Sequence, residues 1–186
     1  MYTLSAYYHK SRVDFMDKKH PLFIGSCGTY HLYTVEKLPT HRPKGRLDYQ
    51  LLYIASGRAH FYFDGKPTVV EAGNMVLYRP REEQRYYYYG ADQTEVYWVH
   101  FTGNNVKNFL RRYGITDDTR IIYTGISIEY KNLVMNHQFN WWFDYAPIRG
   151  LCLQRLKGGC LKHLYRLASK RGYLLVSSLL DSSFCC

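Results

Sequence analysis

The sequence lacks the features of membrane-spanning and exported proteins. No segment of its 186 residues approaches the ~18 consecutive apolar residues that a transmembrane helix requires. Charged residues interrupt the N-terminal segment, which has no apolar stretch of the kind that defines a secretory signal peptide. The five cysteines form an odd set without a Cys-x-x-Cys motif, which predicts free thiols rather than a disulfide framework. These absences predict a cytoplasmic protein with reduced thiols.

Common motifs of catalysis and cofactor binding are also missing. The sequence has no Gly-x-Ser-x-Gly nucleophile elbow and no glycine-rich phosphate loop. A metal site on a small β-barrel would use a His-x-His pair, but His60 and His100 each stand alone in their strand-like segments. Glu82 and Glu83 are adjacent, so in an extended segment their carboxylates would point apart. We therefore expect no enzymatic activity, no metal and no cofactor.

Acidic residues are scarce near the C-terminus. Of 25 basic and 15 acidic residues in the chain, residues 126–186 hold 8 and 3, and no carboxylate lies between Asp144 and Asp181. A basic block of this kind can attract nucleic acid. It is more typical of a solvated helix face or of a degraded tail, and the sequence leaves these alternatives open.

The sequence is rich in short strand-like runs. Tyrosine is abundant, with 20 residues, and aromatic rings suit the half-buried surface of a sheet. Between residues 47 and 103 such runs alternate with turn signals at the spacing of a small β-barrel or sandwich, a fold that can hold one small ligand. Asp64-Gly65 predicts a type I′ hairpin turn, because both central residues of that turn need positive φ. The predicted strands are 22–26, 30–36, 47–55, 58–64, 67–71, 75–79, 84–89, 95–102 and 120–124.

After the β-region the hydrophobic period becomes helical. A first helix is predicted after Asn104-Asn105, which can cap it, and before Gly114, with apolar residues at helical spacing: Val106, Phe109, Leu110 and Tyr113. A second is predicted from about Ser127, and a third near 151–168. The third carries a coiled-coil-like seam that favours dimerisation and includes Leu153, Leu156, Leu164 and Leu167. Gly158-Gly159 interrupts this seam, and 172–186 is an atypical apolar tail.

Four residues are candidates for ligand binding. Trp98 and His100 occupy alternate positions of one predicted strand and therefore share a face. The indole of Trp98 can form an apolar platform for a sugar ring, and the guanidinium of Arg42 can grip two hydroxyls together. Tyr86 can stack or hydrogen-bond. The structural alternatives are a core tryptophan, a surface arginine and a tyrosine in the barrel wall.

These segments resemble a known family. The sequence RPKGRLDYQLLYIASGRAHFYFDG, followed by VVEAGNMVLYRP, YYYYGAD and EVYWVHFTG, resembles the N-terminal effector-binding and dimerisation domain of AraC-type transcription regulators. The resemblance covers about residues 20–135. It implies a mainly β, cupin-like jelly-roll barrel that holds a small effector, often a sugar, without metal. Helices after the barrel would then form a homodimer.

By motif position, the resemblance implies that Arg42, Tyr86 and Trp98 contact the ligand. An N-terminal arm around Tyr7 and Tyr8 would close the pocket. Arabinose-responsive members carry a histidine two places before the tryptophan, where this chain has Val96, so the resemblance leaves the identity of the sugar open.

The family continues with two helix-turn-helix motifs, whereas only 61 residues follow Gly125 here. We expect the sensor part of a regulator, with DNA as a partner only through a further C-terminal domain and with no membrane partner. The predicted organisation is an arm (1–21), an effector-binding barrel (22–125), a helical dimerisation segment (126–171) and a truncated or frame-disturbed tail (172–186). The alternatives are a cupin-fold enzyme acting on a sugar and a nucleic-acid contact made by residues 145–172.

Overall fold

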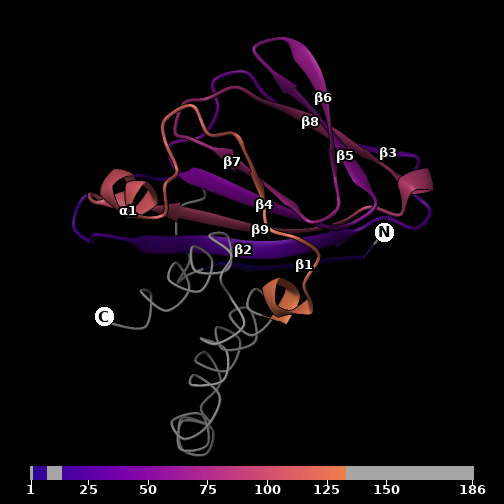
Figure 1. Cartoon of the computed structure of the whole chain (residues 1–186), viewed down its shortest axis with the longest axis horizontal. Coiled ribbons are helices and arrows are strands. Elements are labelled where there is room, and N and C mark those ends of the chain that lie inside the picture. Colours follow the sequence, from indigo (N-terminus) through magenta and orange to yellow (C-terminus); the bar gives the residue numbers. More distant parts are fainter. Residues whose placement is uncertain (1, 8–13, 133–186) are drawn as a thin grey trace, which may run out of the picture.

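Two antiparallel sheets face each other in the computed structural model, which describes residues 2–7 and 14–132 (Figure 1). The six-stranded sheet has the order β1-β2-β9-β4-β7-β10, and the four-stranded sheet has the order β3-β8-β5-β6. The strands are β1 (Tyr2–Tyr7), β2 (Phe23–His31), β3 (Lys37–Arg42), β4 (Tyr49–Ser56), β5 (Arg58–Phe63), β6 (Lys66–Glu71), β7 (Asn74–Tyr78), β8 (Gln84–Tyr89), β9 (Glu95–Thr102) and β10 (Ile121–Tyr123). The helical elements are η1 (Gly90–Asp92) and α1 (Val106–Arg112). The predicted mainly β class is confirmed.

The core between the sheets contains side chains from both of them. Successive residues of a strand point to opposite faces, so that alternate residues of β4 and β9 reach this inner core. From the four-stranded sheet come alternate residues of β5 and β8. The buried members are Leu32, Leu52, Ile54, Ala59, Phe61, Val70, Val76, Tyr78, Tyr86, Tyr88, Val96 and Trp98.

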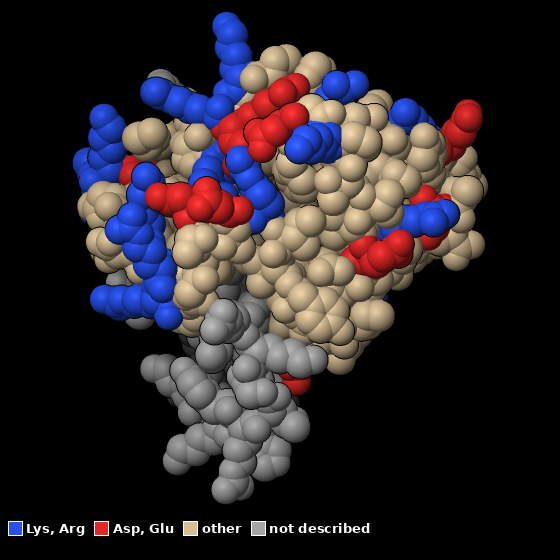
Figure 2. Space-filling model, turned by 45° about the horizontal axis from the view of Figure 1, so that its top comes forward, with Lys and Arg blue, Asp and Glu red and all other residues tan. Residues whose placement is uncertain are grey.

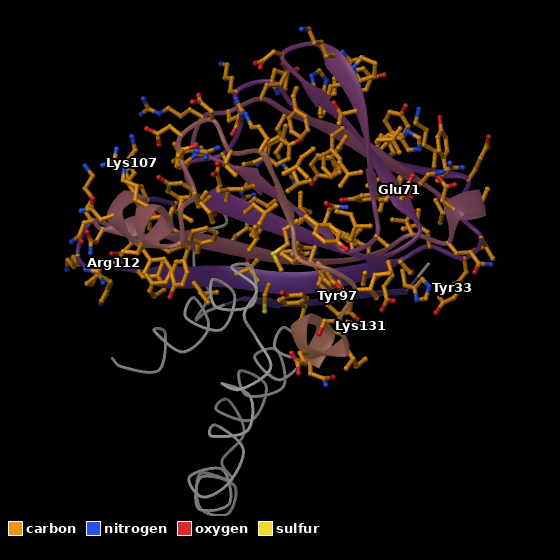
Figure 3. All side chains as sticks on the ribbon, viewed as in Figure 1. Tyr33, Glu71, Tyr97, Lys107, Arg112 and Lys131 are labelled. Atoms are coloured by element: carbon orange, nitrogen blue, oxygen red, sulfur yellow. The ribbon has the colours of Figure 1, made fainter. Side chains whose placement is uncertain are left out.

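A second, outer core covers the opposite face of the six-stranded sheet. The intervening residues of β4 and β9, such as Leu51 and Val99, pack there with Val106 and Leu110 of α1. Below the sheet in Figure 3, Tyr97 and Lys131 lie together, and Lys131 Nζ is 2.8 Å from a carboxylate oxygen of Glu95. The central strands β4 and β9 of the six-stranded sheet are therefore buried on both faces.

One predicted strand was misplaced. Residues 30–36 do not form a separate strand: β2 continues to His31, and the next strand is Lys37–Arg42 in the other sheet. The intervening residues carry the chain from one sheet to the other. There the Gly90 N–H donates to the Glu36 carbonyl, and a Cβ on Gly90 would lie 2.1 Å from the Val35 carbonyl oxygen. This connection contains β-branched residues, which are typical of strands, and they account for the wrong prediction.

Part of the predicted N-terminal arm is a strand. β1 pairs antiparallel with β2 from Tyr2 opposite His31 to Tyr7 opposite Ser26. It thereby satisfies backbone groups on one edge of β2, which are costly to leave unpaired. The role of this segment as a lid over a ligand stays a prediction.

The hairpin and first-helix predictions are confirmed. Asp64 and Gly65 both have positive φ, 51° and 77°, between β5 and β6. α1 ends before Gly114, whose φ is 71°. Asn105 occupies the N-cap position, but its side chain makes no capping hydrogen bond.

The remaining predictions for the C-terminal part lie almost entirely outside the described residues. Residues 128–132 are helical, as expected for the start of the second helix. The third helix, its leucine seam and the apolar tail fall beyond the described range. Within that range, no helix has both the length and the apolar character needed to cross a membrane.

Cys27 is the cysteine that falls within the described residues. It is buried without a disulfide partner, and burial raises the pKa of its thiol. This agrees with the prediction of free thiols at that position.

Candidate ligand-binding site between the sheets

Polar side chains gather at one end of the inner core. The inner-facing positions of β8 are Gln84, Tyr86 and Tyr88, and those of β9 include Trp98 and His100. Strand pairing sets their neighbours. Gln50 of β4 is opposite His100 of β9, and Arg42 of β3 is opposite Gln84 of β8. Each sheet thus contributes a pair of polar residues to the same inner space.

Hydrogen bonds join these side chains within and between the sheets. Arg42 Nη1 donates to Gln84 Oε1 at 2.9 Å. Gln50 Nε2 donates to the Tyr86 hydroxyl at 3.4 Å, and this bond crosses from the six-stranded sheet to the four-stranded sheet. The guanidinium of Arg42 therefore has one of its five donors fixed by an amide and keeps others for a ligand.

A buried ion pair lies beside His100. Arg46 binds Asp48 through two hydrogen bonds, Nε to Oδ1 at 2.6 Å and Nη2 to Oδ2 at 2.8 Å. Burial opposes ionisation of Asp48, but Arg46 and His100 together outweigh it and lower the pKa of the carboxyl. The pair is nearly neutral as a unit, so it fixes geometry without adding net charge to the interior.

His100 is neutral at pH 7. Burial lowers its pKa below the ordinary 6.5, the charges of Arg46 and Arg42 lower it further, and Asp48 acts in the opposite direction. Asp48 Oδ1 is 3.5 Å from Nδ1 of His100, without the geometry of a hydrogen bond. A neutral imidazole offers one donor and one acceptor, which suits a hydroxyl group.

Aromatic rings form the walls of the site. The Trp98 ring centroid is 5.0 Å from that of His100 and 6.1 Å from that of Tyr30. Tyr86 lies between Tyr78 and Tyr88, at centroid distances of 5.9 and 5.6 Å. Gly28 of β2 is the cross-strand partner of Trp98. Because glycine has no side chain, the space next to the indole on the inner face is not filled from β2.

Several buried polar atoms of this region have no hydrogen-bond partner among the described residues. Such atoms are uncommon, since an unpaired buried group costs roughly 1–3 kcal/mol. Here they include donors and acceptors on both sheets, and all belong to inner-facing side chains: Gln50 Oε1, the Tyr78 hydroxyl, Gln84 Nε2, the Tyr88 hydroxyl, Trp98 Nε1 and His100 Nδ1. They are groups that a polar ligand can satisfy.

The structure brings together four of the predicted ligand residues: Arg42, Tyr86, Trp98 and His100. The charge of Arg42 contributes to the lowered pKa of His100, as expected for groups in one site. Their role in binding stays a prediction. Tyr7 belongs to β1, although its side chain is not described, and Tyr8 lies outside the described residues together with the predicted dimerisation residues Leu153, Leu156, Leu164 and Leu167.

The sequence analysis missed Gln50, Gln84 and Tyr88. The signal for two of them was available, since Gln84 and Tyr88 have the same parity as Tyr86 in one predicted strand. Gln50 shares parity with Leu52 in the predicted strand 47–55. Polar residues at inward positions of a strand are the feature to look for.

Metal ligands do not cluster in the described part of the chain. No group of three His, Cys, Asp or Glu side chains there could hold a metal ion. His60 faces away from the site: it stacks on Tyr87 with ring centroids 4.9 Å apart, and its Nε2 is 3.6 Å from Asp92. His60 and His100 therefore do not form a pair.

Comparison with solved structures finds distant similarities. YhaK from Escherichia coli is 12% identical, with a TM-score of 0.43, over 68% of this chain and 52% of that chain. Unsaturated fatty acid bound ToxT from Vibrio cholerae is 16% identical, with a TM-score of 0.40, over 68% of this chain and 47% of that one. The Cnp3 cupin domain of Schizosaccharomyces pombe is 12% identical, with a TM-score of 0.36, over 57% of this chain and 72% of that one. The chain spans about half the length of YhaK and ToxT.

A search of curated proteins finds no match. A family match, by contrast, covers most of the barrel and more than half of the chain. The matching family is described as the AraC-like ligand binding domain, and the match runs over residues 26–137. It includes strands β3, β4, β8 and β9, which carry the polar inner residues. The chain belongs to the AraC-like ligand binding domain family.

Proposed function

We propose that this domain senses a sugar or a similar polyhydroxy compound bound between the two sheets, and that it is not an enzyme. The observation that carries the proposal is the set of buried, unpartnered polar atoms beside the Trp98 ring. A hydroxyl group both donates and accepts, and therefore matches a wall that presents donors such as Gln84 Nε2 and acceptors such as Gln50 Oε1. The indole supplies the apolar surface that the C–H face of a sugar needs.

The unpaired acceptors of the site favour an uncharged ligand with hydroxyl groups. Arg46 and Asp48 neutralise each other, and the lowered pKa of His100 favours its neutral form. Arg42 keeps its positive charge, since the Gln84 amide that accepts from it is neutral. A carboxylate ligand has only acceptors and would leave Gln50 Oε1 without a donor, whereas a hydroxyl would satisfy it.

A thermal-shift titration with pentoses, hexoses and polyols tests the proposal. A specific ligand at a hundred times its Kd should add about 2.7 kcal/mol to the free energy of unfolding. Arg42→Ala and Trp98→Ala should each weaken binding at least ~10-fold, since each removes a hydrogen-bonding or stacking partner. Arg85→Ala is the matched control, because Arg85 is exposed on the outer face of the same sheet, 4.2 Å from the Tyr62 ring.

Two results would contradict the sugar site. The first is unchanged sugar affinity in both inner variants while the Arg85 control behaves normally. The second is a cooperative thermal unfolding transition whose Tm no compound of the panel raises. A sugar-converting enzyme would change the sugar, whereas a sensor would release it unchanged. We therefore expect NMR spectra of the ligand after prolonged incubation to show the starting compound alone.

We further propose that the domain acts as a homodimer in a transcription regulator, with its helical segment 126–171 at the interface and DNA contacts made by another part of the regulator. The family match and the leucine seam support this assignment. Sedimentation equilibrium of the full chain should give twice the 22.1 kDa of one chain, and Leu156→Asp together with Leu164→Asp should give a monomer. A monomeric wild-type chain at micromolar concentration would refute the dimer.

A further inference from the structure

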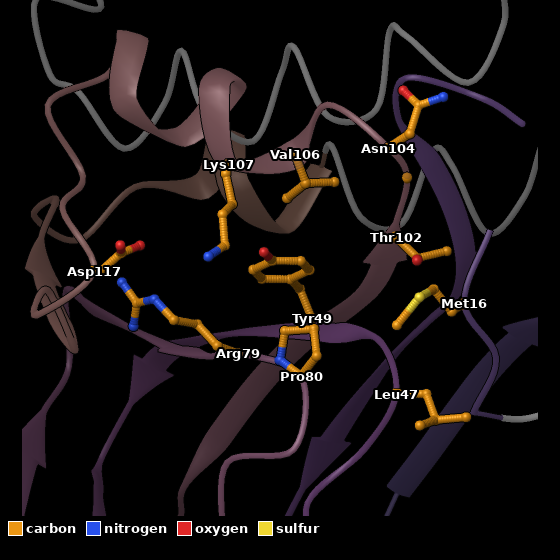
Figure 4. A pocket seen from close by; sticks show the side chains of 11 residues that line it. Met16, Leu47, Tyr49, Arg79, Pro80, Thr102, Asn104, Val106, Lys107 and Asp117 are labelled. Carbon is orange, nitrogen blue, oxygen red and sulfur yellow. The ribbon is translucent and has the colours of Figure 1, made fainter. Parts of the chain in front are cut away.

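A cavity lies outside the inner core, where α1 meets the ends of β4, β7 and β9 (Figure 4). Its volume is about 580 Å³, within the range of small-molecule sites. The inner residues Arg42, Tyr86, Trp98 and His100 are not among those that line it. The cavity is therefore a separate candidate site, with its own chemistry.

Arg79 supplies a half-buried positive charge at this cavity. Its Nη2 donates to the Thr116 carbonyl and, at 2.9 Å, to the Thr119 carbonyl. Its Nη1 is buried and has no hydrogen-bond partner within residues 2–7 and 14–132. Burial lowers the pKa of Arg79, and the nearby charge of Arg120 lowers it further. Arg120 is itself paired with Glu82.

Lys107 supplies a second positive charge. It comes from α1, and in Figure 4 its side chain points into the cavity from the side opposite Arg79. In the described part of the chain no ion pair or hydrogen bond involves its ammonium group. Tyr49 also lines the cavity; burial raises the pKa of its hydroxyl, and the charge of Arg79 acts in the opposite direction. The three side chains thus present donors to one space.

The lining favours a single negative charge. Asp117 is the acidic residue of the lining, and its carboxylate is 3.9 Å from Arg111 Nη2 on the exposed side. The charged residues of the lining are Arg79, Lys107 and Asp117, so the lining itself has a net charge of +1. Lys and Arg also gather toward the α1 side of the face shown in Figure 2, which would draw an anion toward this end of the molecule.

Met16, Leu47, Pro80 and Val106 give the cavity apolar surface, next to Thr102, Gly103 and Asn104. Met16 and Leu47 are exposed to 45% and 39% of their area. Covering such side chains with a hydrocarbon group is favourable in proportion to the apolar area removed from water. The cavity therefore combines a cationic end with an apolar side, the arrangement that an amphipathic acid requires.

We propose that this cavity binds a small organic monocarboxylate with a compact apolar body. The carboxylate accepts hydrogen bonds from Lys107 and the Tyr49 hydroxyl beside the positive charge of Arg79, and the apolar body covers Met16 and Leu47. A dianion fits less well, because Asp117 repels the second charge. This site is independent of the sugar site between the sheets, and ligands can occupy both.

Calorimetric titration of the full chain with cyclohexanecarboxylate tests the proposal, with the neutral cyclohexanecarboxamide as the matched probe. The acid should bind saturably at millimolar concentration or below and at least ~10-fold more tightly than the amide, since charge-assisted hydrogen bonds are roughly twice as strong as neutral ones. Lys107→Met should weaken binding of the acid about 10-fold. Lys66→Met is the control, because Lys66 is exposed on β6 of the other sheet.

Arg79 also donates hydrogen bonds to the Thr116 and Thr119 carbonyls. Substituting it would disturb this loop as well as the cavity, so Lys107 is the better residue to test. Lys107 is exposed, and its loss should leave the melting temperature and the sugar titration unchanged. Equal affinity of the acid for wild type and Lys107→Met, equal affinity of acid and amide, or no saturable binding would each overturn the proposal. Trp98→Ala should leave acid binding intact, so failure of the sugar site and failure of this site are distinguishable.

Discussion

The Tyr88 hydroxyl allows a test of whether the inner core is built for a ligand rather than for stability. Tyr88 is 1% exposed and its hydroxyl has no hydrogen-bond partner among the described residues. Burial raises the pKa of Tyr88 well above its ordinary value, so the group is a neutral phenol at any working pH. Phenylalanine keeps the ring and its contact with Tyr86, at 5.6 Å between centroids, and removes only the hydroxyl.

Tyr88→Phe should therefore stabilise the protein without ligand. A buried hydroxyl without a partner costs roughly 1–3 kcal/mol, so removing it should raise the free energy of unfolding by about 1 kcal/mol. For a chain of this size that corresponds to an increase of about 2–4 °C in Tm. Urea unfolding followed by tryptophan fluorescence and a thermal melt measure the two quantities independently.

Tyr53→Phe is the matched control. The Tyr53 hydroxyl donates to the Gly125 carbonyl at 3.3 Å and accepts from the Ser127 N–H at 3.0 Å. Losing it leaves partners unsatisfied and should destabilise the protein by about 1–2 kcal/mol. The two substitutions remove the same atom from the same residue type, yet the expected changes have opposite signs.

Loss of stability in Tyr88→Phe comparable to that in Tyr53→Phe would refute the reasoning, because it would mean that the Tyr88 hydroxyl is already satisfied in the free protein. If the hydroxyl serves a sugar instead, Tyr88→Phe should bind that sugar about 3–10-fold more weakly while melting at a higher temperature. A more stable variant with unchanged affinity would remove Tyr88 from the ligand site.

Two further predictions concern pH and backbone geometry. The folded-state pKa of His100 lies below its ordinary 6.5, so the unfolded chain binds a proton at this residue more readily than the folded protein does. The free energy of unfolding should therefore fall as pH drops below about 6.5. Urea midpoints at pH 7.5 and 5.5 should differ less in His100→Gln than in wild type. Gly45→Ala should destabilise by more than about 2 kcal/mol, since Gly45 has φ 61° and its added Cβ would lie 2.2 Å from the Glu82 carbonyl oxygen. Gly65→Ala, with φ 77° but nothing within 4 Å, should cost about 1 kcal/mol in the same urea series; equal losses would contradict the steric argument.

Strand positions and their faces were accessible from the sequence because they depend on local alternation. The parity rule placed Trp98 and His100 on one face, and the strand register confirms it. The same rule applied to β8 would have added Gln84 and Tyr88 to Tyr86. The hairpin at Asp64-Gly65 was likewise readable, because positive φ restricts the choice of residues.

Contacts between distant segments were not accessible. Arg42 meets Gln84, and Arg79 meets the carbonyls of Thr116 and Thr119, across separations of about 40 residues. Such pairs depend on which strands become neighbours, which no local pattern encodes. The misplaced strand at 30–36 has the same origin, since the point where a chain passes from one sheet to the other is set by the packing of the whole barrel.

The two-sided burial of the central strands β4 and β9 has a consequence for how such a domain can be redesigned. Along β9, Trp98 and His100 face the inner core, whereas Val99 and Phe101 face the outer one. A mutational library that varies every second codon of this strand would therefore change the inner wall and leave the outer face with its original residues. Deleting one residue in the middle of β9 would exchange the two sets and damage both cores at once. Residues that face the inner wall and residues that support the outer core alternate along a single strand. The two sets can be mutated separately as long as no insertion or deletion shifts this alternation.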